Sequence, residues 1–258
     1  MSIVFITGAT SGIGEAMAWH YAREGAALGL VGRRATVLDA LAGALRQQHG
    51  VAVWTYSLDV TDEVALSAAA VDFMARVGTP DIVVASAGVS AGTLTGSHED
   101  LHVFRRIMEI NVFGMVATFS PFIEAMRQRG SGRLAGFASV AGIRGLPGAG
   151  AYSASKAAAI SYLESLRLEL RSTGIKVVTI APGYIKTPMT DVNPYRMPFL
   201  MPVDVAARRF AAAIAQGRSY IVIPWPMGVV AKLMRLMPNW LYDRLFARAP
   251  RKPRVSSL

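Results

Sequence analysis

Apolar positions along the chain fall into short runs that alternate with longer stretches of helical periodicity. Seven runs of five to eight residues have the continuous apolar, partly β-branched character of buried strands. They occupy residues 2–6, 27–31, 51–58, 81–85, 133–138, 175–180 and 219–223. Between them, apolar residues recur every three or four positions and predict helices, among them residues 15–24, 36–49, 101–129 and 203–216. Strands that alternate with helices predict an α/β protein with a doubly wound parallel sheet in a single domain.

Polar residues mark two of the predicted helices, one at its start and one in its interior. Thr61 precedes one helix and is expected to cap it, with Glu63 supporting its first turn. Asn111 lies inside the apolar stretch 101–129. Asparagine is poorly suited to a helix interior because its side chain competes for backbone hydrogen bonds. We therefore expect a kink or a polar site at Asn111.

A glycine-rich turn follows the first predicted strand directly. The sequence Thr7-Gly8-Ala9-Thr10-Ser11-Gly12-Ile13-Gly14 connects that strand to the helix over residues 15–24. Glycine lets the backbone turn sharply and approach a pyrophosphate, which the free N–H groups of the helix N-terminus then bind. We expect a dinucleotide to contact Gly8, Thr10, Ser11, Gly12, Ile13 and Gly14. The alternative is an ordinary strand-to-helix turn.

The second predicted strand ends at Gly32-Arg33-Arg34, with no acid at the strand end. In dinucleotide-binding folds an acid at this position holds the 2′-hydroxyl of NAD, whereas an arginine accommodates the 2′-phosphate of NADP. Guanidinium groups suit phosphate oxygens, so Arg33 and Arg34 predict NADP(H) over NAD(H). The alternative is a solvated pair of charges that opens the next helix.

Tyr152 and Lys156 stand four residues apart in an alanine-rich stretch with helical periodicity. Positions i and i+4 lie on the same side of a helix. We expect the Lys156 ammonium to lie near the phenol and to lower its pKa from the usual ~10. Tyr152 would then donate and accept a proton near neutral pH. A pattern this short also matches tyrosines and lysines with a purely structural role.

The amino-acid composition excludes several classes of function. The 258 residues are 52% hydrophobic and 17% charged, which supplies a buried core. The absence of cysteine excludes disulfides and thiol catalysis. His98 and His102 are four apart, but no third ligand follows, so no metal site is expected. The chain enters an apolar strand without a leader pattern, and no uninterrupted apolar run is long enough to span a bilayer, so we expect a cytoplasmic protein.

The formal net charge is +10, and residues 225–258 hold +6 of it, with seven cations against Asp243. A basic excess fits several kinds of anionic partner. The cations are not interleaved with aromatic residues as in a nucleic-acid-binding module, so no nucleic-acid partner is expected.

Taken together, these motifs resemble those of the short-chain dehydrogenases/reductases, in the branch of single-domain enzymes about 250 residues long. The resemblance covers roughly residues 3–223. In family order, the motifs are Thr7-Gly8-x-x-x-Gly12-x-Gly14, Asp59-Val60, Ala87-Gly88, Asn111, Ser139, Tyr152-x-x-x-Lys156 and Pro182-Gly183-x-x-x-Thr187. Ser86 departs from the pattern, because the family often has asparagine there; we expect a small effect on that turn.

The resemblance implies a Rossmann-like sheet that binds a nicotinamide cofactor, with Asn111, Ser139, Tyr152 and Lys156 as the catalytic set. Tyr152 would be the general acid when a carbonyl is reduced and the base when an alcohol is oxidised. Lys156 would lower the tyrosine pKa and bind the nicotinamide ribose. Ser139 would hydrogen-bond the substrate oxygen, and Asn111 would hold a water that links Lys156 to solvent.

The resemblance also implies further cofactor contacts and an assembly. Asp59 and Val60 would contact the adenine, and Thr187 the carboxamide. The remaining cofactor contacts would come from Ala87, Gly88, Tyr152, Lys156, Pro182, Gly183 and Ile185. The family pairs subunits across the helix around Asn111 and the small-residue face of the Tyr152 helix, which implies a homodimer or homotetramer.

These features predict an NADP(H)-dependent oxidoreductase that interconverts a ketone and a secondary alcohol. The proline-rich segment 188–202 looks like a mobile loop without regular structure, and its apolar residues favour a hydrophobic or bulky substrate. These residues are Met189, Tyr195, Met197, Phe199 and Leu200. One alternative is a reductase of ketones linked to acyl carrier protein or CoA. A non-catalytic, dinucleotide-sensing regulator is the other.

Residues 225–258 are expected to be a helical addition to a catalytic domain of residues 1–224. Helical spacing runs through residues 227–248, and Pro238 divides the stretch into two short helices. These helices would pack on the substrate mouth or a neighbouring subunit, or lie on a membrane surface or lipid-like substrate. The tail, residues 249–258, is expected to be disordered.

Overall fold

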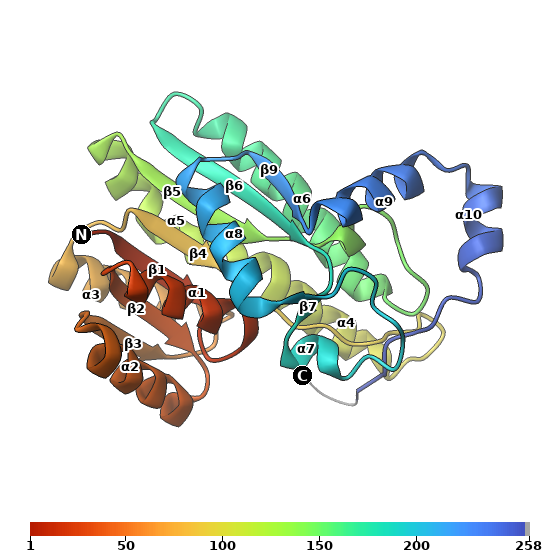
Figure 1. Cartoon of the computed structure of the whole chain (residues 1–258), viewed down its shortest axis with the longest axis horizontal. Coiled ribbons are helices and arrows are strands. Elements are labelled where there is room, and N and C mark those ends of the chain that lie inside the picture. The colour runs from red at the N-terminus through yellow and green to blue at the C-terminus, as the bar shows by residue number, and fades with distance from the viewer. Residues whose placement is uncertain (256–258) are drawn as a thin grey trace.

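A parallel sheet of seven strands organises the molecule, in the order β3-β2-β1-β4-β5-β6-β9 (Figure 1). The structure is a computed structural model and describes residues 1–255. The strands are β1 Ile3–Thr7, β2 Ala27–Gly32, β3 Val53–Ser57, β4 Ile82–Ala85, β5 Gly132–Phe137, β6 Ile175–Pro182 and β9 Tyr220–Ile223. Every neighbouring pair is parallel. The predicted doubly wound α/β fold is confirmed.

Helices cover both faces of the sheet. Alternation along β1 shows why: Val4 and Ile6 belong to the core on one face, and Phe5 to the core on the other. One layer holds α1 (Gly12–Arg23), α2 (Ala35–His49) and α8 (Val203–Ala215). The opposite layer holds α3 (Glu63–Val77), α5 (Gly114–Arg129) and α6 (Gly150–Glu169). Each fully buried large side chain in these cores stabilises the fold by roughly 1.5–3 kcal/mol.

The stretch around Asn111 departs from a regular α-helix. Helix α4 (Asp100–Met108) passes into a π-helical turn, Glu109–Phe113, before α5 begins. The Asn111 side chain is fully buried; it accepts from the Val89 amide at 2.8 Å and donates to the Val89 carbonyl and Ser155 Oγ, each at 3.0 Å. The predicted local irregularity and polar site are both present.

The continuous helical stretch Asp100–Arg129 is long and apolar enough to cross a membrane by length and composition alone, which was not expected from the sequence. Its apolar residues have another use in this fold. Met115, Phe119 and Phe122 are buried in the core on one face of the sheet. Burial of these side chains in the core accounts for part of the hydropathy of the stretch.

Two local predictions are wrong. Asp62, not Thr61, caps α3, because its carboxylate accepts from the Ala65 amide at 2.9 Å while Thr61 bonds Asp59. Segment 188–202 also contains regular structure. The short helix α7 (Pro188–Asp191) is closed by a capping box between Thr187 and Thr190, and β7 (Ile185–Lys186) pairs with β8 (Met201–Pro202).

The C-terminal addition consists of two helices, α9 (Trp225–Leu236) and α10 (Asn239–Phe246), as the proline at position 238 predicted. They extend beyond the end of the sheet (Figure 1). Arg144 joins them to the body of the protein. Its guanidinium donates to the Met237 carbonyl at 2.6 Å and to Asn239 Oδ1 at 2.9 Å, and lies 3.9 Å from the centre of the Tyr242 ring.

The tail after α10 is docked, so the prediction of disorder is wrong for residues 249–255; residues 256–258 lie outside the described part. The buried carboxylate of Asp100 explains the docking, because the Arg254 guanidinium pairs with it at 2.9 Å. The Gly92 amide donates to the Pro253 carbonyl at 2.9 Å, and Lys252 Nζ to the Met189 carbonyl at 2.9 Å.

Hydrogen bonds from Arg254, and then from the backbone, lower the pKa of Asp100. This contact therefore stabilises the fold at neutral pH and is lost only as acid protonates the carboxylate.

We expect Arg254→Gln to release the tail while the sheet stays folded, because Asp100 then loses its cation. Amide hydrogen exchange at Gly92 should accelerate at least about tenfold, since its bond to Pro253 opens locally. Arg248→Gln, which changes an exposed arginine of the same segment, should leave Gly92 exchange unchanged. Equal protection of Gly92 in the wild type and Arg254→Gln would contradict the docking role.

Candidate active site

A cavity of about 520 Å³ opens at the carboxyl ends of the central strands. Parallel sheets place their ligands at this edge, because every strand of the sheet ends there. Eighteen of the twenty predicted site residues line the cavity. They are Gly8, Thr10, Ser11, Gly12, Ile13, Arg33, Arg34, Asp59, Val60, Ala87, Gly88, Ser139, Tyr152, Lys156, Pro182, Gly183, Ile185 and Thr187. Gly14 and Asn111 do not line it.

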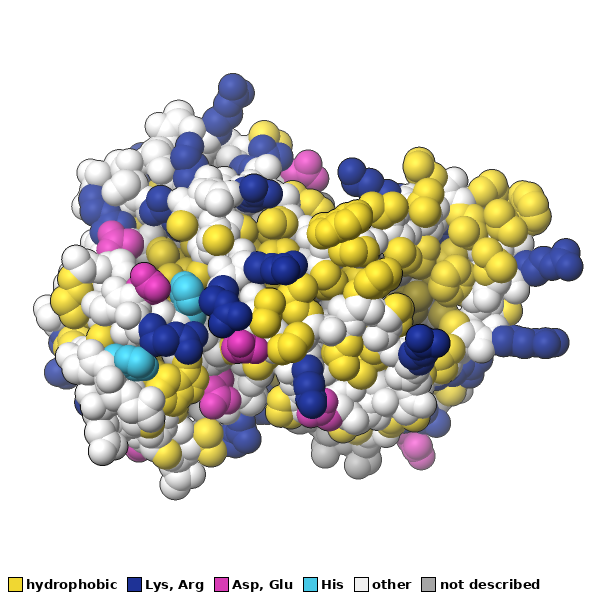
Figure 2. All heavy atoms as spheres, viewed as in Figure 1, with side chains coloured by type: hydrophobic (Ala, Val, Ile, Leu, Met, Phe, Trp, Pro, Cys, Tyr) yellow, Lys and Arg dark blue, Asp and Glu magenta, His cyan; other side chains and the backbone are white. Residues whose placement is uncertain are grey.

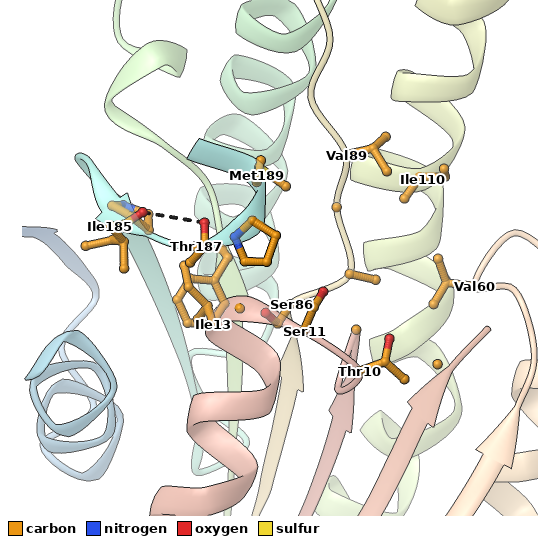
Figure 3. Close-up of a pocket in the computed structure, with 18 of the residues that line it drawn as sticks. Thr10, Ser11, Ile13, Val60, Ser86, Val89, Ile110, Ile185, Thr187 and Met189 are labelled. Atoms are coloured by element: carbon orange, nitrogen blue, oxygen red, sulfur yellow. Dashed lines mark hydrogen bonds between the residues drawn. The ribbon is translucent and has the colours of Figure 1, made fainter. Parts of the chain in front are cut away.

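The glycine turn forms one wall of the cavity. Thr10 and Ser11 lie between β1 and α1, and Ile13 lies in the first turn of α1; all three are across from Thr187 and Met189 (Figure 3). Gly12 has a φ of 59°, which favours glycine, and a Cβ there would lie 3.3 Å from Thr187 Cγ2. The first turn of α1 begins at this point, so its free amides face the cavity end of the sheet.

Gly14 has a packing role. A Cβ at this position would lie 2.2 Å from the Gly8 carbonyl oxygen. The helix start can therefore approach the strand end only because position 14 has no side chain. The close approach keeps the turn compact, although Gly14 itself lies outside the cavity lining.

The two arginines after β2 stand at the far end of the cavity. Arg34 donates to the Thr10 carbonyl at 2.8 Å, which ties the strand end to the glycine turn. Arg33 is half-exposed and lies 3.7 Å from the Asp59 carboxylate. Both guanidinium groups therefore border the cavity from exposed positions.

Asp59 is held by Thr61 and by Arg106, a residue that sequence reasoning missed. Arg106 Nη2 lies 2.5 Å from Asp59 Oδ2, and Thr61 donates to Oδ1 from its amide and its hydroxyl. Burial acts to raise the pKa of Asp59, but the bonds from Thr61 and the charge of Arg106 outweigh it and lower the pKa. An arginine within α4 carries no sequence signal for this contact, because the two residues meet only in the folded chain.

Tyr152, Lys156 and Ser139 meet at the other end of the cavity. Tyr152 and Lys156 project from α6, and Ser139 follows β5 and starts the 3₁₀ turn Val140–Gly142. A hydrogen bond joins the hydroxyl groups of Tyr152 and Ser139. Ser139 Oγ also accepts from the Ala141 amide at 3.1 Å, which fixes its position. Two hydroxyl groups thus face one point in the cavity.

Lys156 lies near the Tyr152 ring as expected, but the expected lowering of the phenol pKa is wrong. Burial raises the pKa of Tyr152, and only the bond with Ser139 acts in the opposite direction. Lys156 Nζ lies 5.8 Å from the centre of the Tyr152 ring and donates to the Phe137 carbonyl at 2.8 Å. Burial also lowers the pKa of Lys156, to about 8. The ammonium is directed at the end of β5, so it stabilises the tyrosinate less than the helical spacing suggested.

Asn111 stands behind the cavity wall. A Cβ added to Gly88 would lie 3.3 Å from Asn111 Oδ1 and 3.6 Å from Lys156 Nζ, so the two side chains converge on this glycine. Through Val89 and Ser155, Asn111 joins the loop after β4 to α6. It thereby holds the helix that carries the tyrosine against the sheet edge.

Several residues outside the predicted catalytic and cofactor-binding set also line the cavity; of these, only Met189 was expected near a substrate. They are Gly32, Leu58, Ser86, Val89, Ile110, Phe137, Ala138, Pro188, Met189 and Thr190. Most of them lie one or two positions from a recognised motif. Closeness to a motif is the one sequence signal that could have predicted them. Among residues 1–255, no cluster of three or more His, Asp or Glu side chains could hold a metal ion.

The Rossmann-like sheet and its edge cavity have the architecture of a dinucleotide-binding protein. The chain belongs to the short-chain dehydrogenase family, which it matches over residues 2–196. An uncharacterized oxidoreductase of Myxococcus xanthus is 39% identical over 238 residues, covering 92% of this chain and 93% of the relative. Dehydrogenase/reductase SDR family member 7B of Bos taurus is 33% identical, covering 99% of this chain and 83% of the relative.

Solved structures agree with this assignment. A short-chain dehydrogenase from Sphingobium yanoikuyae in complex with NADPH superposes with a TM-score of 0.79 at 27% identity, covering 93% of this chain and 97% of that chain. An alcohol dehydrogenase from Thermococcus sibiricus, complexed with 5-hydroxy-NADP, has a TM-score of 0.76 at 26% identity, covering 86% and 96% of the two chains. The family resemblance inferred from the motifs is confirmed.

We expect Gly14→Ala to destabilise the fold by about 1–3 kcal/mol, because its Cβ would overlap the Gly8 carbonyl and force the turn apart. Gly43→Ala is the matched control. This position in α2 has no atom within 4 Å of a new Cβ, so alanine should stabilise the helix by about 0.5–1 kcal/mol. Thermal unfolding followed by circular dichroism measures both. A Gly14→Ala variant that melts at or above the wild-type temperature would contradict the packing role.

Proposed function

We propose that the protein is an NADP(H)-dependent oxidoreductase that interconverts a ketone and a secondary alcohol. The observation that carries the proposal is one cavity with a glycine turn and two arginines at one end and the Tyr152–Ser139 hydroxyl pair at the other. A nicotinamide dinucleotide is an extended molecule with phosphate groups in one part and a reactive ring at one end, so its shape matches that of the cavity. The family membership supports the reaction class.

The lining residues fit a nicotinamide dinucleotide. Glycines at positions 8 and 12 leave room for a pyrophosphate beside the α1 N-terminus. Asp59 and Val60 would hold the adenine, and Arg33 and Arg34 the 2′-phosphate. The lining after β6, namely Pro182, Gly183, Ile185 and Thr187, would hold the nicotinamide end, with Ala87 and Gly88 opposite. When bound, the cofactor supplies or accepts a hydride.

Tyr152 handles the proton in this proposal. Burial keeps its pKa high, so the phenol stays protonated at neutral pH and can donate to a carbonyl oxygen that becomes an alkoxide. Ser139 would hydrogen-bond the same oxygen and stabilise the developing charge. Lys156 would bind the nicotinamide ribose and relay protons. The Phe137 carbonyl holds its ammonium group in place, and Asn111 fixes the position of α6. The high tyrosine pKa favours reduction at neutral pH and oxidation under alkaline conditions.

The walls near Tyr152 support a hydrophobic substrate. Burial raises the pKa of Tyr195, and the nearby phenols of Tyr184 and Tyr152 raise it further. Tyr195 therefore lies close to Tyr152. Its ring packs edge-on against Tyr184, 6.5 Å between centres. Met227 of α9 packs against Gly183, which lines the cavity. The expected setting remains a cytoplasmic homodimer or homotetramer.

Replacing Tyr152 with phenylalanine should lower turnover at least ~100-fold while leaving cofactor binding within about threefold, because the change removes only the proton donor. A panel of ketones assayed with NADPH, beside fluorescence titration of NADPH, measures both quantities. Tyr220→Phe, at an exposed tyrosine at the start of β9, is the matched control and should keep full turnover. Turnover retained in Tyr152→Phe would refute the proton role.

Replacing both Arg33 and Arg34 with alanine should raise the KM for NADPH at least about tenfold, since charge-assisted bonds to a phosphate are lost. The KM for NADH should change less than threefold, because NADH lacks the 2′-phosphate and Arg106 still pairs with Asp59. Arg171→Ala, at an exposed position after α6, is the control. A wild-type preference for NADH would contradict the assignment.

A further inference from the structure

Helices α9 and α10 expose an unusual number of large apolar side chains. We define the C-terminal face as the exposed apolar residues Trp225, Val229, Leu233, Leu236, Trp240 and Leu245. Leu236 is 81% exposed, Trp225 71% and Trp240 70%, although isolated tryptophans are normally well covered. Figure 2 shows hydrophobic side chains gathered over the part of the molecule that carries α9 and α10. Patches of this kind mark interaction sites.

The spacing places the four face residues of α9 on one side of that helix. Residues 225, 229, 233 and 236 recur every three or four positions, whereas the buried Met227 and Ala231 fall on the opposite side and face the protein. The inner side thus anchors the helix, and the outer apolar side is left to solvent. On α10, the buried Tyr242 donates to the Gly145 carbonyl at 2.6 Å and holds that helix in the same way.

Charge decides among the possible occupants. Exposed cations accompany the face, Lys232 on α9 and Arg244 on α10, within a segment of net charge +6. Residues 225–246, which form the two helices, carry Lys232, Arg235 and Arg244 against Asp243, a net charge of +2. A second copy docked through the same face would bring these like charges together, which opposes association. An anionic surface would be attracted by about 1 kcal/mol for each cation that comes near it, which corresponds to about fivefold in affinity. Both tryptophans are exposed, and indole rings favour the boundary between water and lipid.

Length decides how the helices meet such a surface. With 12 and 8 residues, α9 and α10 extend about 18 and 12 Å at 1.5 Å per residue. Both fall short of the ~30 Å hydrocarbon core of a bilayer. They can lie in the plane of the headgroups with the apolar side inward, but they cannot span it.

We propose that the C-terminal face is a docking surface for an anionic phospholipid bilayer, on which the protein sits as a peripheral membrane protein. Exposed apolar helix faces, two tryptophans and flanking cations carry the inference. The inference does not depend on the proposed redox reaction, because binding is measured without substrate.

Vesicle cosedimentation with the full chain tests the proposal. We expect binding to vesicles of phosphatidylcholine with 30 mol% phosphatidylserine at about 0.1 M salt, and at least about tenfold weaker binding to pure phosphatidylcholine. Leu233→Ser with Trp240→Ser should weaken binding at least about tenfold through lost apolar contact. Lys232→Glu with Arg244→Glu should do the same on the anionic vesicles and less on neutral ones.

The matched control is Val64→Ser with Leu168→Ser, which removes two equally exposed apolar side chains from α3 and α6. It should bind vesicles like the wild type. Brominated acyl chains should quench tryptophan fluorescence in the wild type and far less in Trp225→Phe with Trp240→Phe, which retains Trp19 and Trp54. This readout separates insertion of the face from mere attraction by charge.

Two results would overturn the proposal. One is vesicle binding that is equal in the wild type and Leu233→Ser with Trp240→Ser, since the face then plays no part. The other is absence of vesicle binding together with a dimer, seen by sedimentation, that the same double variant dissociates. That result would assign the face to self-association.

Discussion

Burial of both faces of one parallel sheet is the constraint on which the rest of the structure depends. The strands are covered on each side by helices, so away from their ends the backbone and side chains of the strands cannot contact a ligand. Only the ends of the strands remain accessible. The connections that leave the carboxyl ends carry nearly all the cavity residues. Close approach of backbone segments at Gly8 and Gly14 then determines how near a ligand can come.

Polar contacts behind the cavity wall hold the reactive side chains in position. Asn111 connects the loop after β4 to α6, and the Phe137 carbonyl holds Lys156 at the end of β5. Asn111 lies within the π-helical turn Glu109–Phe113, and such turns are frequent at functional sites. The environment, and not the spacing of Tyr152 and Lys156 alone, sets the pKa of the phenol.

The sequence was sufficient for features that arise from local pattern. Strand and helix order, the glycine turn, the anomaly at Asn111 and the division of the C-terminal helices all depend on residues near one another in the chain. Features that join distant segments could not be found this way. Arg106 meets Asp59 across 47 residues and Arg254 meets Asp100 across 154, and neither pair leaves a signature in either segment. The direction of the Lys156 ammonium also depends on β5, which no helical spacing describes.

The return of the tail to the loops beside the cavity has a practical consequence for handling the protein. Residues 252–254 contact Met189, Gly92 and Asp100, whereas β1 begins at the opposite, amino edge of the sheet. An affinity tag or fluorescent reporter joined behind the tail would compete with this anchorage and crowd Met189, which lines the cavity. The same label joined ahead of Met1 would stand clear of both, so purification and imaging reagents belong at the amino end.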